Sequence, residues 1–86
     1  MIRSVIIDDQ ESYRKKLRKI IETILPDKIE ILAEASNIAE GMEIINRNQP
    51  ELVFLDIEMP VMNGFELLEQ FKEIPFSVIF TTSYDQ

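Results

Sequence analysis

The chain has 86 residues, of which 45% are hydrophobic and 29% are charged, and its formal net charge is −7 at pH 7. This is the composition of a small soluble domain, and its acidity predicts that it does not bind nucleic acid directly. No apolar run reaches the about 20 residues that a membrane span needs. Because a signal peptide is also lacking, we expect a cytoplasmic location. Because the chain contains no Cys and no His, carboxylates are the side chains that remain for catalysis or metal binding.

The chain begins with the pattern of a buried strand followed by an amphipathic helix. Ile2–Ile7 is a short, β-branched and mostly apolar run, typical of a strand covered on both faces, and it ends at Asp8 and Asp9. Apolar residues then recur at spacings of three and four over residues 13–25, which predicts a helix that Pro26 closes. The helix also carries a basic run, which we interpret as its solvated side rather than as a phosphate-binding patch: Arg14, Lys15, Lys16, Arg18 and Lys19.

A second strand and a second helix follow. Ile29–Ala35 predicts the strand. Asn37, with Glu40 three positions later, is a capping-box pattern that opens the helix, and Pro50 ends it. Gly41 inside this helix is unfavourable by about 1 kcal/mol relative to Ala, which is tolerable if the helix approaches the sheet closely.

The third strand leads directly into an acidic residue. Leu52–Leu55 is wholly apolar and is followed by Asp56, and the loop after it carries Pro60 and Gly64. Such a short apolar run fits a strand that is buried on both faces.

The last part of the chain predicts a third helix and a fourth strand. Asn63 and Glu66 form another capping-box pattern, and the helix that they open is expected to end at Pro75. Ser77–Thr82 predicts the strand. We expect the helix to bury three residues: Phe65, Leu68 and Phe71.

The alternation of strands and helices indicates the fold class. The order β-α-β-α-β-α-β is typical of an α/β domain with a parallel sheet, helices on both faces and right-handed crossovers. No repeat, linker or low-complexity segment interrupts the chain, so we expect one domain over residues 1–86.

Polar side chains follow three of the predicted strands. Asp8 and Asp9 follow the first, Asp56 follows the third, and Thr82 with Ser83 ends the fourth. In open α/β sheets the ligand lies outside the carboxyl ends of the strands, so the three carboxylates converge if the first and third strands are neighbours. Carboxylates that close repel one another, and an all-oxygen site of this kind suits Mg²⁺.

The same residues indicate a type of reaction. Asp56 is a candidate nucleophile toward phosphorus, which would form an aspartyl phosphate. Phosphoryl transfer needs mainly positioning and neutralisation of the phosphoryl oxygens, and the Thr82 hydroxyl could supply one donor for them.

Three stretches carry this predicted site: VIIDDQ, LVFLDIEMPVMNGFELL and VIFTTSYDQ. Together they resemble the receiver domain of bacterial two-component response regulators, over the entire chain. The combination of an acidic pair, a D-x-x-M-P-x-x-x-G loop and a strand-end Thr makes the resemblance specific. It implies a flavodoxin-like (CheY-like), doubly wound parallel sheet with strand order 2-1-3-4. The TTSYDQ stretch is most similar to regulators with a LytTR-type DNA-binding output domain.

The resemblance also implies a role for each site residue. Asp56 is then the phospho-acceptor, and Asp8, Asp9, Asp56 and the backbone carbonyl of Glu58 hold Mg²⁺, with Asp9 the more direct ligand of the acidic pair. Thr82 is the switch hydroxyl that moves toward the phosphoryl group. The domain is then a signalling switch and not an enzyme, beyond catalysing its own phosphoryl transfer. Its partners are a sensor histidine kinase and an output domain, outside this chain, that regulates transcription.

The chain departs from the family pattern at its carboxyl end. The family has a fifth βα unit, with an invariant Lys at the end of the fifth strand and an aromatic switch residue on it, whereas the last basic residue here is Lys72. Tyr84 follows Thr82 in a loop and is not that aromatic residue. We therefore expect residues 1–86 to be a carboxyl-terminally incomplete receiver domain.

Two other function classes stay open. One is a receiver-like interaction module that is not phosphorylated. The other is an Asp-nucleophile phosphatase of the haloacid-dehalogenase type, which uses a D-x-D-x-[TV] motif, whereas Asp56 is followed by Ile57, Glu58 and Met59.

The fourth strand is expected to lie on an edge. Val78, Ile79 and Phe80 would then have unpaired backbone groups and partly uncovered side chains, and exposed apolar edges are templates for pairing with another chain. We therefore expect downstream residues to complete the sheet or a second copy to pack there as a homodimer.

Overall fold

Four parallel strands form one sheet in the order β2-β1-β3-β4. The computed structural model describes residues 1–59 and 63–82, so Pro60, Ser83 and Tyr84 lie outside the described residues. The strands are β1 (Ile2–Ile7), β2 (Ile29–Ala35), β3 (Leu52–Asp56) and β4 (Ser77–Thr81), and the helices are α1 (Glu11–Ile24), α2 (Ile38–Asn48) and α3 (Gly64–Leu68). The predicted fold class and strand order are confirmed.

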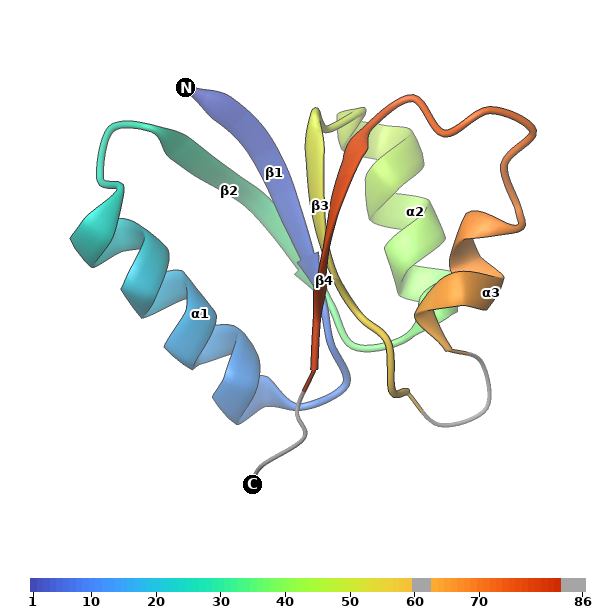
Figure 1. Ribbon diagram of the computed structural model, residues 1–86, viewed down its shortest axis with the longest axis horizontal. Coiled ribbons are helices and arrows are strands. Elements are labelled where there is room, and N and C mark those ends of the chain that lie inside the picture. The colour runs from blue at the N-terminus through green and yellow to red at the C-terminus, as the bar shows by residue number, and fades with distance from the viewer. Residues whose placement is uncertain (60–62, 83–86) are drawn as a thin grey trace.

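Helices cover both faces of the sheet, with α1 on one side and α2 and α3 on the other (Figure 1). Because side chains alternate along a strand, each central strand supplies both faces. Val5 and Ile7 of β1 belong to the core under α2 and α3, whereas Ile6 between them belongs to the core under α1. All five residues of β3 are buried, as expected for a strand in the interior of a parallel sheet.

Helix α2 lies unusually close to the sheet, as its glycine predicts. A β-carbon at Gly41 would lie 2.9 Å from Cδ1 of Ile7 and 3.3 Å from Cδ1 of Leu67. The helix begins at the predicted cap, where the Asn37 side chain accepts a hydrogen bond from the Glu40 N–H (2.8 Å). The carboxylate of Glu40 accepts from the backbone N–H and the hydroxyl of Ser36 and from the side-chain amide of Asn37, but not from the backbone N–H of Asn37, so the capping box is half formed.

Helix α3 differs from the prediction in length and rotation. It ends at Leu68 rather than near Pro75. Its complete capping box, formed by Asn63 and Glu66, is as expected.

The predicted burial of Phe65 is wrong, because that side chain is 49% exposed and its ring packs on Phe80 at 5.2 Å. The large side chain that α3 buries is that of Leu67, while Leu68 and Phe71 pack at the margin of the core. The reason lies in the first turn of the helix, where Gly64 faces the sheet. Because residues three positions apart lie on the same side of a helix, Leu67 faces the sheet too, and Phe65 points sideways.

The predicted solvated basic face of α1 is wrong at two positions. Arg14 and Arg18 both pair with Glu34 of β2, at 3.1 Å and 2.6 Å. Glu34 lies on the strand beside α1, which the helix pattern alone does not reveal. Among the described residues, no helix is long and apolar enough to cross a membrane.

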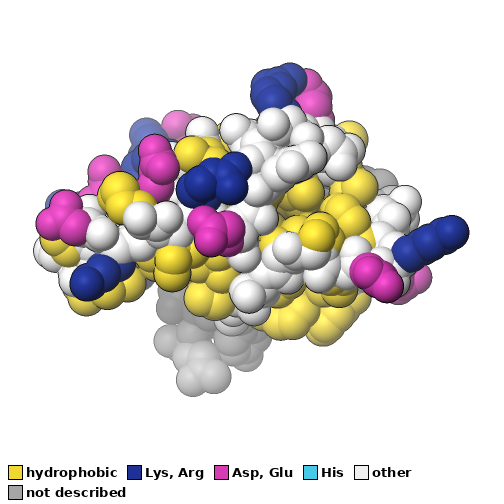
Figure 2. All heavy atoms as spheres, turned by 90° about the horizontal axis from the view of Figure 1, so that it is seen from above, with side chains coloured by type: hydrophobic (Ala, Val, Ile, Leu, Met, Phe, Trp, Pro, Cys, Tyr) yellow, Lys and Arg dark blue, Asp and Glu magenta, His cyan; other side chains and the backbone are white. Residues whose placement is uncertain are grey.

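Strand β4 forms one edge of the described sheet, as predicted, and it ends at Thr81, one residue before the predicted end. Ile79 and Phe80 are 47% and 42% exposed. Apolar side chains also reach the surface elsewhere, as the view in Figure 2 shows.

Candidate functional site

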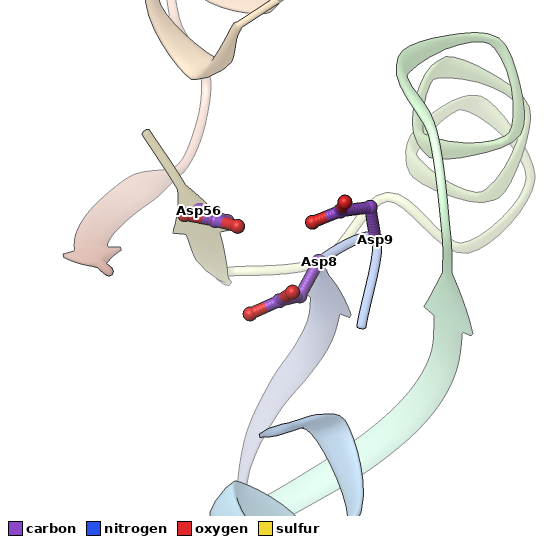
Figure 3. Close-up of side chains that lie close together, drawn as sticks. All are labelled: Asp8, Asp9 and Asp56. Atoms are coloured by element: carbon purple, nitrogen blue, oxygen red, sulfur yellow. The ribbon is translucent and has the colours of Figure 1, made fainter. Parts of the chain in front are cut away.

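Three aspartates meet where β1 and β3 end. The two strands pair in parallel, with Ile7 opposite Leu55, so the residues that follow them, Asp8 and Asp56, emerge side by side. Asp9 follows in the loop toward α1. Figure 3 shows the carboxylates of Asp9 and Asp56 turned toward one another, with that of Asp8 beside them.

The three side chains are close enough to share one small ligand. One carboxylate oxygen from each of Asp8, Asp9 and Asp56 lies within 4.8 Å of the others. Asp56 is fully buried, Asp8 is 5% exposed and Asp9 is partly buried. The convergence that strand adjacency predicts is therefore present.

Backbone hydrogen bonds fix one oxygen of each strand-end carboxylate. Oδ1 of Asp8 accepts from the Gln10 N–H (2.9 Å), and Oδ1 of Asp56 accepts from the Glu58 N–H (3.0 Å). Hydrogen bonds that an aspartate oxygen accepts from the amide two residues on are typical of tight turns, and here they orient the side chains at the strand ends. Within the described part of the chain, Oδ1 of Asp9 and Oδ2 of Asp56 are buried without a hydrogen-bond partner.

Burial and mutual repulsion raise the pKa of two of these carboxyl groups. Burial raises the pKa of Asp56 to about 6; the charges of Asp8 and Asp9 add to this, and the bond from the Glu58 amide opposes it. Burial also raises the pKa of Asp8, with a further rise from Asp9 and an opposing effect of the Gln10 amide. A divalent cation would relieve both effects, and two unpaired buried oxygens in an all-carboxylate site fit a hard cation of this kind.

Glycine is required where the loop after β3 returns to the site. A β-carbon at Gly64 would lie 2.6 Å from the backbone oxygen of Asp56 and 3.1 Å from Leu55. The Gly64 N–H also donates to the Ile57 carbonyl (3.2 Å), so Gly64 is held directly against the backbone of Asp56. The spacing between Asp56 and Gly64 has this steric cause, which the sequence alone did not reveal.

Thr82 follows the strand that neighbours Asp56. Asp56 pairs in register with Thr81, and the Ile57 N–H donates to the Thr81 carbonyl (3.1 Å). Thr82 and Asp8 both line a hollow of about 330 Å³ between α1 and β4. Glu58 contacts the site through its backbone N–H, which donates to Oδ1 of Asp56. The role of its carbonyl as a Mg²⁺ ligand stays a prediction.

One residue near the site was missed by the sequence reasoning. Arg14 donates from Nη1 to the backbone oxygen of Asp8 (2.8 Å), although its place in a basic run indicated a solvated side chain. The sequence positions of Arg14 and Glu34 do not predict their ion pair, because the pairing depends on how α1 packs on β2.

A larger hollow, of about 750 Å³, lies at the other end of the sheet. Its walls come from the end of α2, the starts of β3 and β4 and the segment after α3, including Pro50, Phe71 and Ile74. The three aspartates are not among the residues that line it.

The fold and the acidic cluster define a doubly wound α/β domain with its site at the carboxyl ends of β1 and β3. Residues 5–86 match the family model described as the response regulator receiver domain. The chain belongs to this family, which works in two-component systems.

Known relatives and a solved structure agree with this assignment. The chain is 39% identical over 87 residues to an uncharacterized response regulatory protein of Vibrio cholerae, and 33% identical over 88 residues to the sensory transduction protein LytT of Bacillus anthracis. Both alignments cover 100% of this chain but only 36% and 35% of the relatives, so the chain spans about a third of their length. The likeness to LytT agrees with the expected similarity to LytTR-type regulators.

One similar solved structure is that of a DNA-binding response regulator of the LuxR family from Staphylococcus aureus. The TM-score is 0.83 and the identity 33%, and the alignment covers 100% of this chain and 72% of that one.

Proposed function

We propose that this receiver domain accepts a phosphoryl group on Asp56 from the phosphohistidine of a sensor histidine kinase, with Mg²⁺ bound at the acidic cluster. The observation that carries the proposal is the meeting of three carboxylates within 4.8 Å, two of them with a buried oxygen that has no hydrogen-bond partner in the described chain. Without a cation or a phosphoryl group, such oxygens are costly to bury.

Asp56 is the best nucleophile of the three. Its Oδ1 is held by the Glu58 amide, which fixes the direction of Oδ2, an oxygen with no hydrogen-bond partner among the residues that the structure describes. In the proposed transfer this oxygen attacks phosphorus: an O–P bond forms, the P–N bond to the donor imidazole breaks, and that nitrogen keeps the bonding pair and takes a proton from solvent. With its pKa at about 6, Asp56 is mostly ionised at neutral pH and can attack.

The other site residues support the same step. Asp8 and Asp9, with Asp56 and the carbonyl of Glu58, would hold Mg²⁺, which neutralises phosphoryl oxygens during the transfer. Thr82 would turn its hydroxyl toward the phosphoryl group once it is attached. Its position supports this role, because it follows Thr81, the residue paired with Asp56 across β3 and β4.

The signal is proposed to pass to an output domain outside this chain, in the cytoplasm. The chain covers about a third of its curated relatives, and its structural neighbour from Staphylococcus aureus is described as DNA-binding. A DNA-binding output that regulates transcription is therefore the proposed partner. A homodimer through the exposed edge of β4 is a further proposal, supported by the exposure of Ile79 and Phe80.

The test is labelling of the full-length protein that contains this domain, with a small acyl phosphate and Mg²⁺. We expect one base-labile phosphoryl group in the wild type, and none in Asp56→Asn or after chelation of Mg²⁺. Glu58→Gln is the matched control, because it changes a neighbouring carboxylate and keeps the backbone amide and carbonyl. A chain that binds Mg²⁺ but takes no label from either the acyl phosphate or a phosphorylated kinase would instead be an interaction module. The family match leaves the phosphatase alternative without support.

A further inference from the structure

Arg14 of α1 connects the acidic cluster of Asp8, Asp9 and Asp56 to strand β2. Its Nη1 donates to the backbone oxygen of Asp8 (2.8 Å), and its Nε donates to Oε1 of Glu34 (3.1 Å). The side chain is only 16% exposed, so both contacts are partly shielded from water. One guanidinium on α1 thus connects β2 to the loop that follows β1.

The contact bears on Asp9 through the peptide bond. The Asp8 carbonyl lies in the same rigid plane as the nitrogen and α-carbon of Asp9, so a donor fixed on that oxygen restricts the orientation of Asp9. The other end of Asp8 is also held, since its N–H donates to the Ala35 carbonyl (3.0 Å). Oδ1 of Asp9 has no partner among the described residues, so its position depends on the backbone that Arg14 restrains.

Arg18 provides a natural comparison one helical turn further on. It bonds the same Glu34 carboxylate, with Nε at 2.7 Å and Nη2 at 2.6 Å from Oε2. Among the described contacts, it has none with Asp8. The two arginines therefore share the role of attaching α1 to β2 and differ in the contact with the acidic loop.

We infer that Arg14 is a positioning residue for the acidic cluster: by holding the Asp8 carbonyl, it aligns Asp9 for the cation. This inference rests on the proposed function, because that proposal supplies the Mg²⁺ ion. The hydrogen bonds of Arg14 with Asp8 and Glu34 do not depend on it. An arginine suits this role because its planar fork serves two acceptors at once, whereas a lysine has a single charged nitrogen. Groups that orient metal ligands affect metal affinity without touching the ion.

The experiment compares Arg14→Ala and Arg18→Ala in the full chain, with wild type and Asp9→Asn beside them. Isothermal titration with Mg²⁺ gives the affinities, and the amide NMR resonance of Asp9 is followed in metal-free protein. We expect Arg14→Ala to weaken Mg²⁺ binding about tenfold and to shift the Asp9 resonance. Arg18→Ala should stay within about twofold of wild type and leave that resonance in place, although both variants lose a partly exposed ion pair with Glu34.

Each outcome decides the inference. Equal loss of affinity in the two variants would overturn it, because the shared contact with Glu34 would then explain the effect, and so would an unmoved Asp9 resonance in Arg14→Ala. If the wild type binds no Mg²⁺, the proposed metal site fails and the Asp9 resonance alone tests the role of Arg14. If Arg14→Ala does not fold, Arg14→Gln replaces it, since Gln keeps the methylene packing without the reach of the guanidinium.

Discussion

Gly64 lies directly against Asp56: a β-carbon at Gly64 would be 2.6 Å from the Asp56 backbone oxygen. Backbone cannot move aside as the end of a side chain can. We therefore expect Gly64→Ala to lower the free energy of unfolding by about 2 kcal/mol, measured in urea, and to reduce labelling of Asp56. The control is Gly41→Ala, where the nearest atom is the flexible tip of Ile7 and the gain in helix propensity offsets the crowding, for a net change within about 1 kcal/mol. Similar losses in the two variants would contradict this steric account.

Asp56 should destabilise the metal-free fold at neutral pH. In the folded chain its pKa is raised to about 6 from the ordinary 3.8, so the folded state binds its proton more tightly than the unfolded state does. Its contribution is therefore most favourable below pH 3.8 and is lost as the pH rises to about 6. Asp56→Asn should accordingly be more stable than wild type at pH 7 by about 3 kcal/mol, because each pKa unit corresponds to about 1.4 kcal/mol.

That stability difference has two internal checks. It should shrink as the pH falls from 6 to below 3.8, where the wild-type carboxyl becomes protonated in both states. Saturating Mg²⁺ should stabilise the wild type and leave Asp56→Asn less affected. A difference that is constant from pH 4 to pH 7 would show that the carboxylate charge is not its cause.

Asp9 should matter to the metal far more than the nearest acid on α1. Asp9→Asn is expected to weaken Mg²⁺ binding more than about tenfold, because a buried carboxylate oxygen of the cluster loses its charge. Glu11→Gln, which breaks an exposed pair with Lys15 at 3.3 Å, should stay within about twofold. Calorimetric titration of both variants measures this, and equal affinities would remove Asp9 from the site.

The rotation of α3 predicts unequal effects of two neighbouring residues. Leu67 is fully buried, so Leu67→Ala should lower the free energy of unfolding by about 3 kcal/mol. Phe65 is 49% exposed and packs on the edge residue Phe80, so Phe65→Ala should lower it by about 1 kcal/mol. Urea titrations of the two variants decide between this rotation and the one with Phe65 inward.

Local signals were enough to predict the order of elements. The strands Ile2–Ile7 and Ile29–Ala35 have the bounds that their apolar runs predict, and α2 begins after the Asn37 cap. Short β-branched runs and capping residues act over a few positions, so they can be recognised without knowing the fold. The three acids of the cluster were also predicted, because polar residues that follow parallel strands meet at one edge of the sheet.

Tertiary structure decided what depends on distant residues. Local sequence patterns do not predict the pairing of Arg14 with Glu34 or the contact of Gly64 with Asp56. They also do not predict that Phe65 points away from the core. The burial of Asp9 and Asp56 oxygens that have no hydrogen-bond partner in the described part of the chain is a property of the packed site as well. The amino-acid sequence by itself thus determined which segments form and which groups reach the site. The packing of helices on the sheet determined their orientation and partners, because those contacts exist only after distant segments have met.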